Sequence, residues 1–292
     1  MKILSVNAGS SSLKFQLYEM PEEKVLISGL MERIGVENSF YTIKVNGEKI
    51  KKEVELNNHE EALETLVKEL EENNVVESLD EIEGIGHRVV QGGDYFDKTV
   101  VIDDEVLAKI DELSSLAPLH NPAAVTGIKA AKDVFPNAVQ TAVFDTAFHQ
   151  TMPKENFLYA LPISWYTDLK VRRYGAHGTS HKFVSQRMNE ILKRDDTKII
   201  TCHIGNGASV SAVLNGKCVN TSMGLTPNAG LIMGTRCGDI DASIIPYVME
   251  KTNMSPKEID NAINKESGLL ALSRKSSDSR DIEDGIASGD EN

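Results

Sequence analysis

Hydrophobic and polar positions alternate near the start of the chain in a way that predicts two strands joined by a short turn. An apolar strand leads to Gly9 and three serines, after which Leu13, Phe15 and Leu17 fall on one face with a period of two residues. Glycine leaves the backbone of the turn open, so its N–H groups can converge on an anion, and Lys14 adds a positive charge. The pattern predicts a hairpin, which is either purely structural or a phosphate site.

Residues 199–219 repeat this order of apolar strand, glycine- and serine-rich turn and alternating strand. Two such hairpins in one chain suggest two related halves that face a shared cleft. A ligand held between two glycine-rich turns is most economically a polyphosphate. The two hairpins together therefore predict a nucleotide site.

The remaining pattern predicts a mixed α/β chain. Further strands are expected within residues 24–56, with a turn at Asn46-Gly47. Helices are expected over residues 58–73, 103–116, 122–134, 181–194 and 255–264, and buried strands over residues 82–90 and 138–144. Ser180 and Ser255 are the expected N-caps of the last two helices.

The length of 292 residues allows one large domain or two ordinary ones. A loop-rich crossing between Pro153 and Pro162 favours two, an N-terminal domain over residues 1–149 and a C-terminal nucleotide-binding domain over residues 150–292. No closing strand or helix is predicted after residue 286, so the second domain is expected to be incomplete.

Charge and cysteine content narrow the class of protein further. A net charge of −13 without a basic stripe argues against a nucleic-acid partner, and no apolar run reaches transmembrane length. The three cysteines form no CxxC pair, which indicates a reducing compartment and neither a disulfide framework nor a zinc site. We therefore expect a cytoplasmic protein that contacts no membrane.

Two arginines and one aspartate are candidates for a small-ligand site. Arg88 and Arg236 have glycines close by in the sequence, and a guanidinium on open backbone matches a carboxylate or a phosphate. Asp145 directly follows an apolar strand, and α/β ligand sites lie at such strand ends. The alternatives are ordinary ion-paired arginines and an aspartate that caps a turn.

The histidines predict hydrogen-bond donors rather than a metal site. His177 and His181 are four residues apart, but no glutamate follows the first and no third ligand is evident, so His177 is preferred as a donor to a phosphoryl group. His120 precedes a helix and is either a donor or structural. His59 and His87 are expected to be structural or to face solvent.

Well-known nucleotide motifs are missing from the sequence. It contains no GxxxxGK(S/T) loop, no GxGxxG fingerprint and no protein-kinase motif set, which excludes the corresponding folds. A polar turn at Asp278-Ser279-Arg280 is either an adenosine contact or a simple loop.

These motifs, taken together, resemble the acetate kinase (acetokinase) family of the acetate and sugar kinase/Hsp70/actin superfamily. The matching stretches are Asn7-Ala-Gly-Ser-Ser-Ser-Leu-Lys14, Gly86-His-Arg-Val-Val90, Leu116-Ala-Pro-Leu-His-Asn-Pro122, Val143-Phe-Asp-Thr-Ala-Phe-His-Gln-Thr-Met-Pro153, His177-Gly-Thr-Ser-His181, His203-Ile-Gly-Asn-Gly207 and Met233-Gly-Thr-Arg236. The resemblance implies two actin-like (ribonuclease H-like) domains with a nucleotide cleft between them. It also implies a homodimer that transfers the γ-phosphoryl group of ATP to acetate, giving acetyl phosphate and ADP.

The resemblance also implies roles for individual residues. Arg88 matches the acetate-binding arginine, Asp145 the catalytic acid/base, and His177 and Arg236 the groups that stabilise the transition state. The other implied contacts are Asn7 near Mg²⁺ or Mn²⁺; Ser10, Ser12 and Lys14 at the ATP phosphates; Val90, Leu119, His120 and Pro227 at the acetate; His203, Ile204, Gly205, Asn206 and Gly207 in the second phosphate turn; and Asp278, Ser279 and Arg280 at the adenosine.

One implied role conflicts with simple acid–base chemistry. Acetate is already ionised at neutral pH, because the pKa of a carboxylic acid is about 4 to 5. No proton must leave the nucleophile, so Asp145 is expected to orient Arg88 or metal-bound water rather than to act as a base. In-line transfer then depends on positioning and on positive charge around the phosphoryl oxygens.

The sequence departs from the family at four places. The family continues with an adenosine loop, a metal-binding Glu and a final helix, so this chain is expected to be truncated and to bind ATP poorly. Ala176 replaces an aromatic residue that walls the methyl pocket, which predicts space for propionate. Ala271 and Arg274 replace glycines, and Gln91 replaces a histidine. An inactive fragment and a propionate or short-chain acyl kinase are therefore the alternatives.

Overall fold

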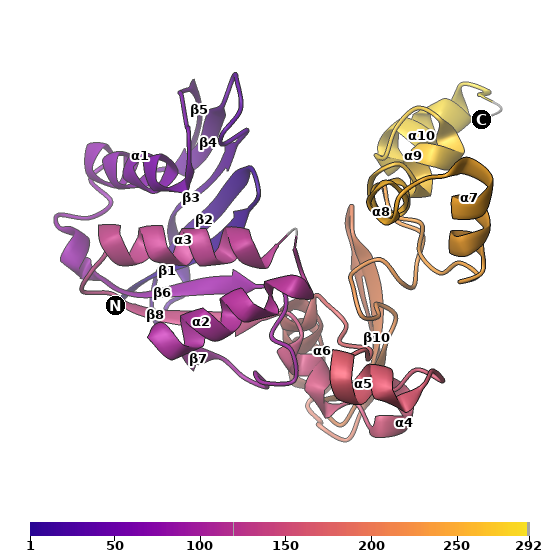
Figure 1. The fold of residues 1–292 in the computed structure, drawn as a ribbon. Helices are drawn as coiled ribbons and strands as arrows, with labels where there is room; N and C mark the ends of the chain where they lie inside the picture. The colour runs from indigo at the N-terminus through magenta and orange to yellow at the C-terminus, as the bar shows by residue number, and fades with distance from the viewer. Residues whose placement is uncertain (119, 291–292) are drawn as a thin grey trace. The chain divides into compact units, whose positions relative to one another are not determined.

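The computed structural model describes residues 1–118 and 120–290, and the chain divides into two compact units. The first unit runs from Met1 to Ala147 and the second from Phe148 to Asn292 (Figure 1). The division expected after residue 149 lies close to this point. Leu119, an expected wall of the acetate site, lies outside the described residues.

Within the described residues, the first unit is built on an eight-stranded sheet of order β5-β4-β3-β2-β1-β6-β8-β7. Its strands are β1 (Lys2–Gly9), β2 (Ser12–Glu19), β3 (Lys24–Glu32), β4 (Phe40–Val45), β5 (Glu48–Glu53), β6 (Ile82–Val89), β7 (Val100–Val101) and β8 (Val139–Phe144). Strands β1 to β5 are antiparallel neighbours, whereas β6 pairs in parallel with both β1 and β8.

The first hairpin has the predicted pattern. Leu13, Phe15 and Leu17 are at most 1% exposed, and they share a face because side chains alternate along a strand. Asn7 pairs with Lys14 across the hairpin, next to the turn. Both of these residues therefore belong to the face of the hairpin opposite the core.

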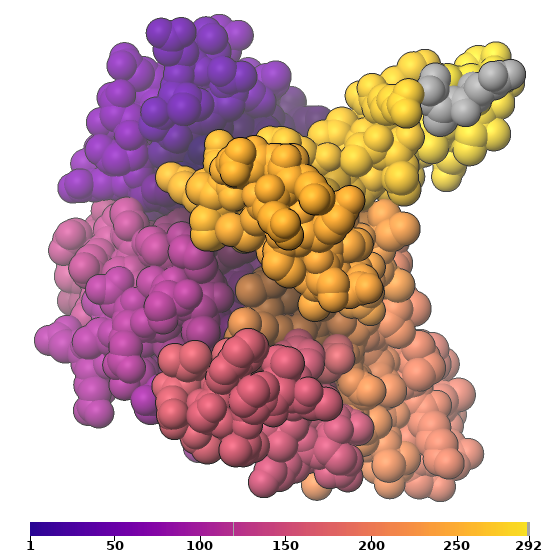
Figure 2. Space-filling model, turned by 45° about the vertical axis from the view of Figure 1, so that its right-hand side comes forward, coloured from indigo at the N-terminus to yellow at the C-terminus, as the bar shows by residue number. Residues whose placement is uncertain are grey.

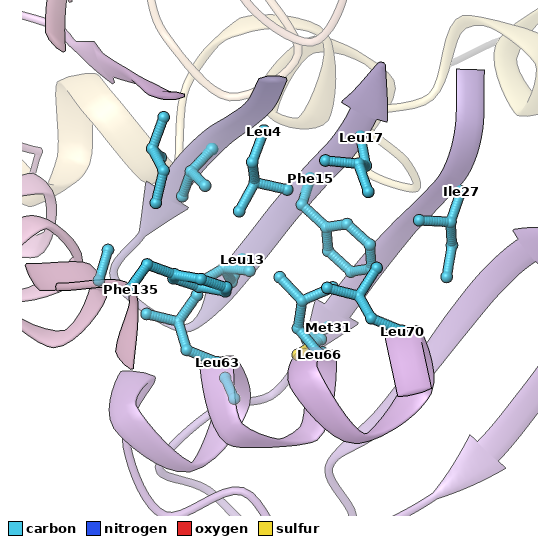
Figure 3. Packing of buried hydrophobic residues seen from close by; sticks show 14 of the residues in the cluster. Leu4, Leu13, Phe15, Leu17, Ile27, Met31, Leu63, Leu66, Leu70 and Phe135 are labelled. Carbon is cyan, nitrogen blue, oxygen red and sulfur yellow. The ribbon is translucent and has the colours of Figure 1, made fainter. Parts of the chain in front are cut away.

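Helices cover one face of this sheet and bury its apolar side chains. They are α1 (His59–Glu72), η1 (Leu79–Glu81), α2 (Asp104–Glu112), η2 (Leu113–Ser115) and α3 (Asn121–Val134). Helices α1 and α3 lie side by side (Figure 1). In Figure 3, Leu63 and Leu66 of α1 point toward Leu13 and Phe15 of the sheet. Each such leucine stabilises the fold by about 1.5–3 kcal/mol through its burial.

A buried carboxylate joins helix α1 to the β4–β5 hairpin. Glu69 is 1% exposed, accepts a hydrogen bond from the Tyr41 hydroxyl, and accepts another from Lys52 Nζ at 2.7 Å. Burial alone would raise the pKa of Glu69, but the hydrogen bonds from Lys52 and Tyr41 outweigh it and hold that pKa below its usual value of 4.5. Burial, together with the Glu69 carboxylate, raises the pKa of Tyr41 to about 12.

The second unit combines a small sheet with short helices. Its described residues include a three-stranded antiparallel sheet of order β11-β10-β9, which contains the second predicted hairpin. The elements are η3 (Ala147–Thr151), α4 (Lys154–Phe157), α5 (Ile163–Leu169), α6 (Gly178–Leu192), β9 (Lys198–Ile204), β10 (Ala208–Leu214), β11 (Lys217–Thr221), α7 (Ile244–Thr252), α8 (Pro256–Lys265), α9 (Gly268–Ser273) and α10 (Ser279–Ala287).

Helix α6 begins earlier than its sequence predicts. Ser180 was the expected N-cap, but the helix starts at Gly178 and His177 occupies the N-cap position with a positive φ of 59°. The Ser180 hydroxyl instead lies 2.9 Å from Nδ1 of His203. The capping box of α8 is confirmed, since the Ser255 side chain accepts from the Glu258 N–H and the Glu258 carboxylate accepts from the Ser255 N–H.

The segment near the C-terminus is more helical than predicted. Asp278 was expected in a polar loop or an adenosine turn, but it is the N-cap of α10, a helix at the surface of the second unit (Figure 2). Arg274, where the resemblance implies a glycine, ends α9 in the left-handed conformation at a φ of 56°. Ala271 lies inside α9 and has no such strain. Across the described residues, no helix has both the length and the apolar character needed to cross a bilayer.

Replacing Glu69 with alanine should destabilise the first unit by about 2 kcal/mol at neutral pH, because the Tyr41 hydroxyl and the Lys52 ammonium lose their partner. The folded pKa of Glu69 lies below its ordinary value, so this stabilisation is present above about pH 4.5 and is lost as the pH falls through the folded pKa. Urea unfolding at neutral and acidic pH measures the difference. The exposed Glu71→Ala on the same helix is the control, with a change within about 0.5 kcal/mol; equal losses in both variants would contradict the assignment.

Arg274→Gly should stabilise the second unit by about 1 kcal/mol, because glycine adopts positive φ without the steric cost that arginine meets there. Arg274→Ala keeps that cost and should give no gain. Thermal unfolding of both variants beside the parent chain measures the effect. The same gain in the alanine variant would show that the side chain of Arg274, and not its backbone conformation, is the source of strain.

Candidate active site

The first unit brings Arg88 and Asp145 together at one edge of its sheet. Arg88 lies near the end of β6, and Asp145 follows β8, its parallel neighbour. Nε of Arg88 donates to the two Asp145 carboxylate oxygens at 3.0 and 3.2 Å, and Nη2 donates to Oδ2 at 2.6 Å. Burial alone would lower the pKa of Arg88, but the Asp145 carboxylate outweighs it and raises that pKa. The arginine is therefore a permanent cation held in one orientation.

This ion pair leaves part of the guanidinium available to a ligand. The side chain of Asp145 is 2% exposed, whereas that of Arg88 is 39% exposed. Among the residues that the structure describes, no protein group takes a hydrogen bond from Nη1 of Arg88. An exposed guanidinium amino group beside a buried counterion suits a small carboxylate or phosphate.

The loop that carries Val90 is fixed by buried amide groups. Asn121, fully buried at the start of α3, accepts from the Gln91 N–H at 3.1 Å and donates to the Gln91 carbonyl at 3.0 Å. The Gln91 side chain in turn accepts from the Gly93 N–H at 2.9 Å. Gln91, where the resemblance implies a histidine, is thus part of the loop's internal framework. His120 directly precedes this helix and is half buried.

The first glycine-serine turn lies at the same edge of the sheet. Strand β1 pairs in parallel with β6 as far as Val6 opposite His87, so Asn7 and Arg88 continue neighbouring strands. His59 Nε2 donates to the Gly9 carbonyl at 2.7 Å, which holds the turn against helix α1. Ser10 and Lys14 are exposed and Ser12 is half buried, so polar groups of the turn face solvent.

Two histidines expected to be structural or exposed are structural. His59 supports the turn, and His87 is buried with Nε2 2.8 Å from the Gln140 amide oxygen. Burial lowers the pKa of His87 to about 4, against the opposing effect of this hydrogen bond. His87 is therefore neutral at physiological pH.

In the second unit, His177 and Arg236 converge on the turn between β9 and β10. A β-carbon added to Gly207 would lie 3.2 Å from Nη1 of Arg236 and 3.6 Å from Nε2 of His177. Nη1 of Arg236 also donates to the Pro227 carbonyl at 2.9 Å. Asn206 accepts from the Gly234 N–H at 3.0 Å through its carbonyl, which fixes the Arg236 loop to the turn. Ile204, in contrast, is 69% exposed.

His177 is held in a strained backbone conformation by its neighbours. Its φ of 59° lies in the left-handed region, which is uncommon for residues other than glycine even though histidine adopts it more often than most, and such strain concentrates at functional sites. The preceding carbonyl, that of Ala176, accepts from His149 Nε2 at 2.9 Å, while Gly175 N–H donates to the Gly224 carbonyl at 3.1 Å. His177 therefore projects from the N-terminus of α6, where the helix dipole favours an anion.

The rings around His177 form a histidine cluster in the second unit. His203 stacks on His177 with ring centroids 4.0 Å apart. His181 is 1% exposed and makes hydrogen bonds through both ring nitrogens. Among the described residues, no group of three or more His, Cys, Asp or Glu side chains is arranged to hold a metal ion.

Ala176 is buried in the second unit. It is 2% exposed and packs with Ala208, Met223 and Met233. Methionine side chains therefore lie beside the position where the resemblance implies an aromatic ring. Methionine adapts well to irregular space.

The expected adenosine contacts are paired with each other. Arg280 Nε and Nη2 donate to Asp278 at 3.0 and 2.5 Å, and these hydrogen bonds lower the pKa of Asp278 to about 2. Ser279 begins α10. These side chains form a compact polar group at the N-terminus of α10.

An oriented guanidinium at parallel strand ends, and an arginine and a histidine above a glycine-rich turn, define a class of α/β protein that binds small carboxylate and phosphoryl anions. The acetokinase family model matches residues 2–292. The chain belongs to this family, whose members are ATP-dependent phosphotransferases.

Individual relatives agree with the family match. The chain is 56% identical to an acetate kinase of Macrococcus caseolyticus over 292 residues, which cover 99% of this chain and 73% of that protein. The crystal structure of Porphyromonas gingivalis acetate kinase superimposes with a TM-score of 0.93 at 46% identity, covering 99% of this chain and 74% of that one. A propionate kinase from Francisella tularensis gives a TM-score of 0.95 at 45% identity, with coverages of 99% and 74%. These superpositions confirm the predicted α/β class, consistent with an actin-like fold.

Several supporting residues of the site have no sequence signal of their own. His149, Ser209 and Cys218 are fully buried, and each hydrogen-bonds to a histidine or to the backbone beside one. His149 lies in the Val143-to-Pro153 motif of the family resemblance. That motif marked the segment but did not indicate a supporting role for His149. The pairing of Ser209 with His177 joins residues 32 positions apart and follows from the fold alone.

Gly207→Ala should lower kcat about tenfold or more, because the added carbon would displace the Arg236 guanidinium and crowd the His177 ring. Steady-state kinetics with ATP and acetate measure this effect. Gly285→Ala on α10 is the control, since its added carbon would meet Asp290 at an ordinary distance of 3.7 Å. An unchanged kcat in Gly207→Ala would show that the groups above this turn do not act on the transferred phosphoryl.

Proposed function

We propose that this chain catalyses reversible transfer of the ATP γ-phosphoryl group to acetate, giving acetyl phosphate and ADP by direct in-line displacement. The observation that carries the proposal is the convergence of Arg236 and His177 above the Gly207 turn. Phosphoryl transfer spreads negative charge over the equatorial oxygens, so donors fixed around one point supply most of the catalysis. The family membership and the relatives named acetate kinase support the same reaction.

Each unit contributes different groups to this proposal. In the first, Arg88 holds the acetate carboxylate, Val90 and His120 border it, and Ser10, Ser12 and Lys14 contact the phosphates. In the second, His177 and Arg236 stabilise the transition state, with Pro227 beside Arg236. The turn from His203 to Gly207 holds phosphate, and Asp278, Ser279 and Arg280 contact adenosine.

Asp145 acts on Arg88 in this mechanism and not on the substrate proton. Acetate carries no proton at neutral pH, so the nucleophile needs no base. Both carboxylate oxygens of Asp145 already accept hydrogen bonds from Arg88. We therefore assign Asp145 the role of holding the guanidinium in the plane that a carboxylate requires.

ATP enters as its complex with Mg²⁺ or Mn²⁺. Mg²⁺ keeps several waters and binds mainly through substrate phosphates, so it needs few ligands from the protein. The amide of Asn7, half buried beside the first turn, is the protein group that we assign to this ion. When bound, such an ion would supply positive charge that offsets the negative charge of the ATP phosphates.

A propionate or other short-chain acyl kinase is the second candidate. The structural match to a propionate kinase at a TM-score of 0.95 favours it. The packing of Ala176 against Met223 and Met233 bears on the choice, because methionine can yield to one extra methylene. Ala176→Phe should raise selectivity for acetate over propionate; equal or lower selectivity would remove Ala176 from the substrate pocket.

We also propose that the chain forms a homodimer in the cytoplasm. Phe183 and Ile191 of α6, and Ile200 of β9, are more than 60% exposed, which is typical of a surface that another protein covers. Sedimentation velocity tests the association. The free thiols of Cys202, Cys218 and Cys237 suit a reducing compartment.

Trapping of acyl phosphate as its hydroxamate tests the reaction directly. ATP- and Mg²⁺-dependent product with acetate supports the proposal, and the rate with propionate in the same assay decides between the two candidates. A folded chain that forms neither acyl phosphate would contradict both.

Asp145→Asn should raise the KM for acetate about tenfold or more and lower kcat, because the amide loses the charge that holds Arg88 and faces it with a donor. Steady-state kinetics of both enzymes with acetate measure the change. A KM for acetate within about twofold of the parent value, with kcat alone reduced, would contradict the assigned role.

A further inference from the structure

A buried hydroxyl joins two histidines in the second unit. Ser209 Oγ lies 2.8 Å from Nδ1 of His177 and 2.8 Å from Nε2 of His181. Ser209 is fully buried in β10 and His181 is 1% exposed in α6. The other ring nitrogen of His181, Nδ1, lies 2.7 Å from the Thr201 hydroxyl oxygen. The four side chains form one continuous chain of hydrogen bonds.

The number of protons in this chain restricts its arrangements. A serine hydroxyl has one proton to donate and can accept in return, so its two nitrogen partners differ in role. If Ser209 donates to His181 Nε2, then neutral His177 carries its proton on Nδ1 and neutral His181 carries its own on Nδ1. If Ser209 donates to His177 Nδ1, then both rings carry their proton on Nε2. The two rings therefore share one tautomer in either arrangement.

Thr201 completes both arrangements without leaving a buried group unpaired. In the first, Thr201 Oγ1 accepts from His181 Nδ1 and donates to the Ser211 carbonyl at 3.4 Å. In the second, the Thr201 hydroxyl donates to His181 Nδ1 over the shorter distance of 2.7 Å. The proton inventory is the same in both, and only the direction of the hydrogen bonds changes.

A phosphoryl group distinguishes the two arrangements. Nε2 of His177 is the nitrogen that approaches the Gly207 turn, and Nδ1 faces Ser209. An anionic oxygen at the turn is stabilised by an Nε2–H donor and repelled by an Nε2 lone pair. Binding of the anion therefore favours the second arrangement, in which neutral His177 is already a donor.

We propose that Ser209 is a positioning residue that couples the tautomers of His177 and His181, so that His177 presents Nε2–H to the phosphoryl group when His181 also carries its proton on Nε2. The catalytic part of this inference rests on the proposed kinase function. The coupling itself does not, because it follows from the hydroxyl between the rings. His203, stacked on the face of His177, is outside this chain, since its Nδ1 bonds to Ser180.

Nuclear magnetic resonance of the full chain labelled with ¹⁵N-histidine tests the coupling. Long-range nitrogen–proton correlations at about pH 8, above the ordinary histidine pKa of about 6.5, identify which nitrogen carries the proton in each assigned ring. We expect the same tautomer in both rings of the free chain. With magnesium, a non-hydrolysable ATP analogue and acetate, both rings should be protonated on Nε2. Opposite tautomers in His177 and His181 would overturn the proposal.

Ser209→Ala and Ser211→Ala provide a matched pair for kinetics. Ser211 is equally buried on the same strand, but its hydroxyl bonds to Thr221 at 2.8 Å. Ser209→Ala should uncouple the two tautomers and lower kcat roughly ten- to a hundredfold, with KM values for ATP and acetate within about twofold of the parent. Ser211→Ala should leave kcat and the tautomers near those of the parent.

The outcomes separate this inference from the proposed function. Coupled tautomers in a chain without acetate- or propionate-dependent turnover would contradict the kinase function and leave the coupling established. If Ser209→Ala keeps the kcat of the parent and the same tautomers of His177 and His181, the coupling is contradicted and the kinase function stays in place.

Discussion

The parallel pairing of β1, β6 and β8 is the constraint on which the first unit's site depends. Parallel neighbours end at the same edge of a sheet, so residues distant in sequence meet there without any loop having to reach across. Asn7, Arg88 and Asp145 continue or follow these strands. The Arg88–Asp145 pair is consequently fixed by backbone hydrogen bonds of the sheet, and the buried aspartate turns a flexible side chain into an oriented fork.

The second unit positions its groups by a different means. Here His177 has a left-handed backbone conformation that costs roughly 1–3 kcal/mol and persists only where neighbours hold it. The His149 hydrogen bond to the Ala176 carbonyl and the Gly175 hydrogen bond to Gly224 supply that restraint. Strain at His177 is thus offset by contacts outside the ligand site, and the ring is directed to the turn before any ligand binds.

The sequence correctly predicted structural features that depend on residues close together in the chain. Period-two burial gave the first hairpin, and the Ser255–Glu258 capping box gave the start of α8, because both depend on near neighbours in sequence. The start of α6 could not be predicted in this way. Ser180 is a good N-cap residue, but its hydroxyl meets His203, a partner that only the β9–α6 packing supplies. Arg88 and Asp145 were each predicted as candidates, yet their pairing, like that of Ser209 with the histidines, required the fold.

Hydrogen-bond partners distinguish two groups of histidines among the described residues. Three of them bond through Nε2 to an oxygen that can only accept, namely His59, His87 and His149. Their tautomer is fixed by the protein, which suits a structural donor. His177 and His181 share the Ser209 hydroxyl, which can donate to one ring while it accepts from the other. In the coupling that we propose, the proton positions of these two rings follow the charge of a ligand. In that coupling, the hydroxyl shared between the two rings is therefore what suits His177 to a phosphoryl group whose charge moves during transfer.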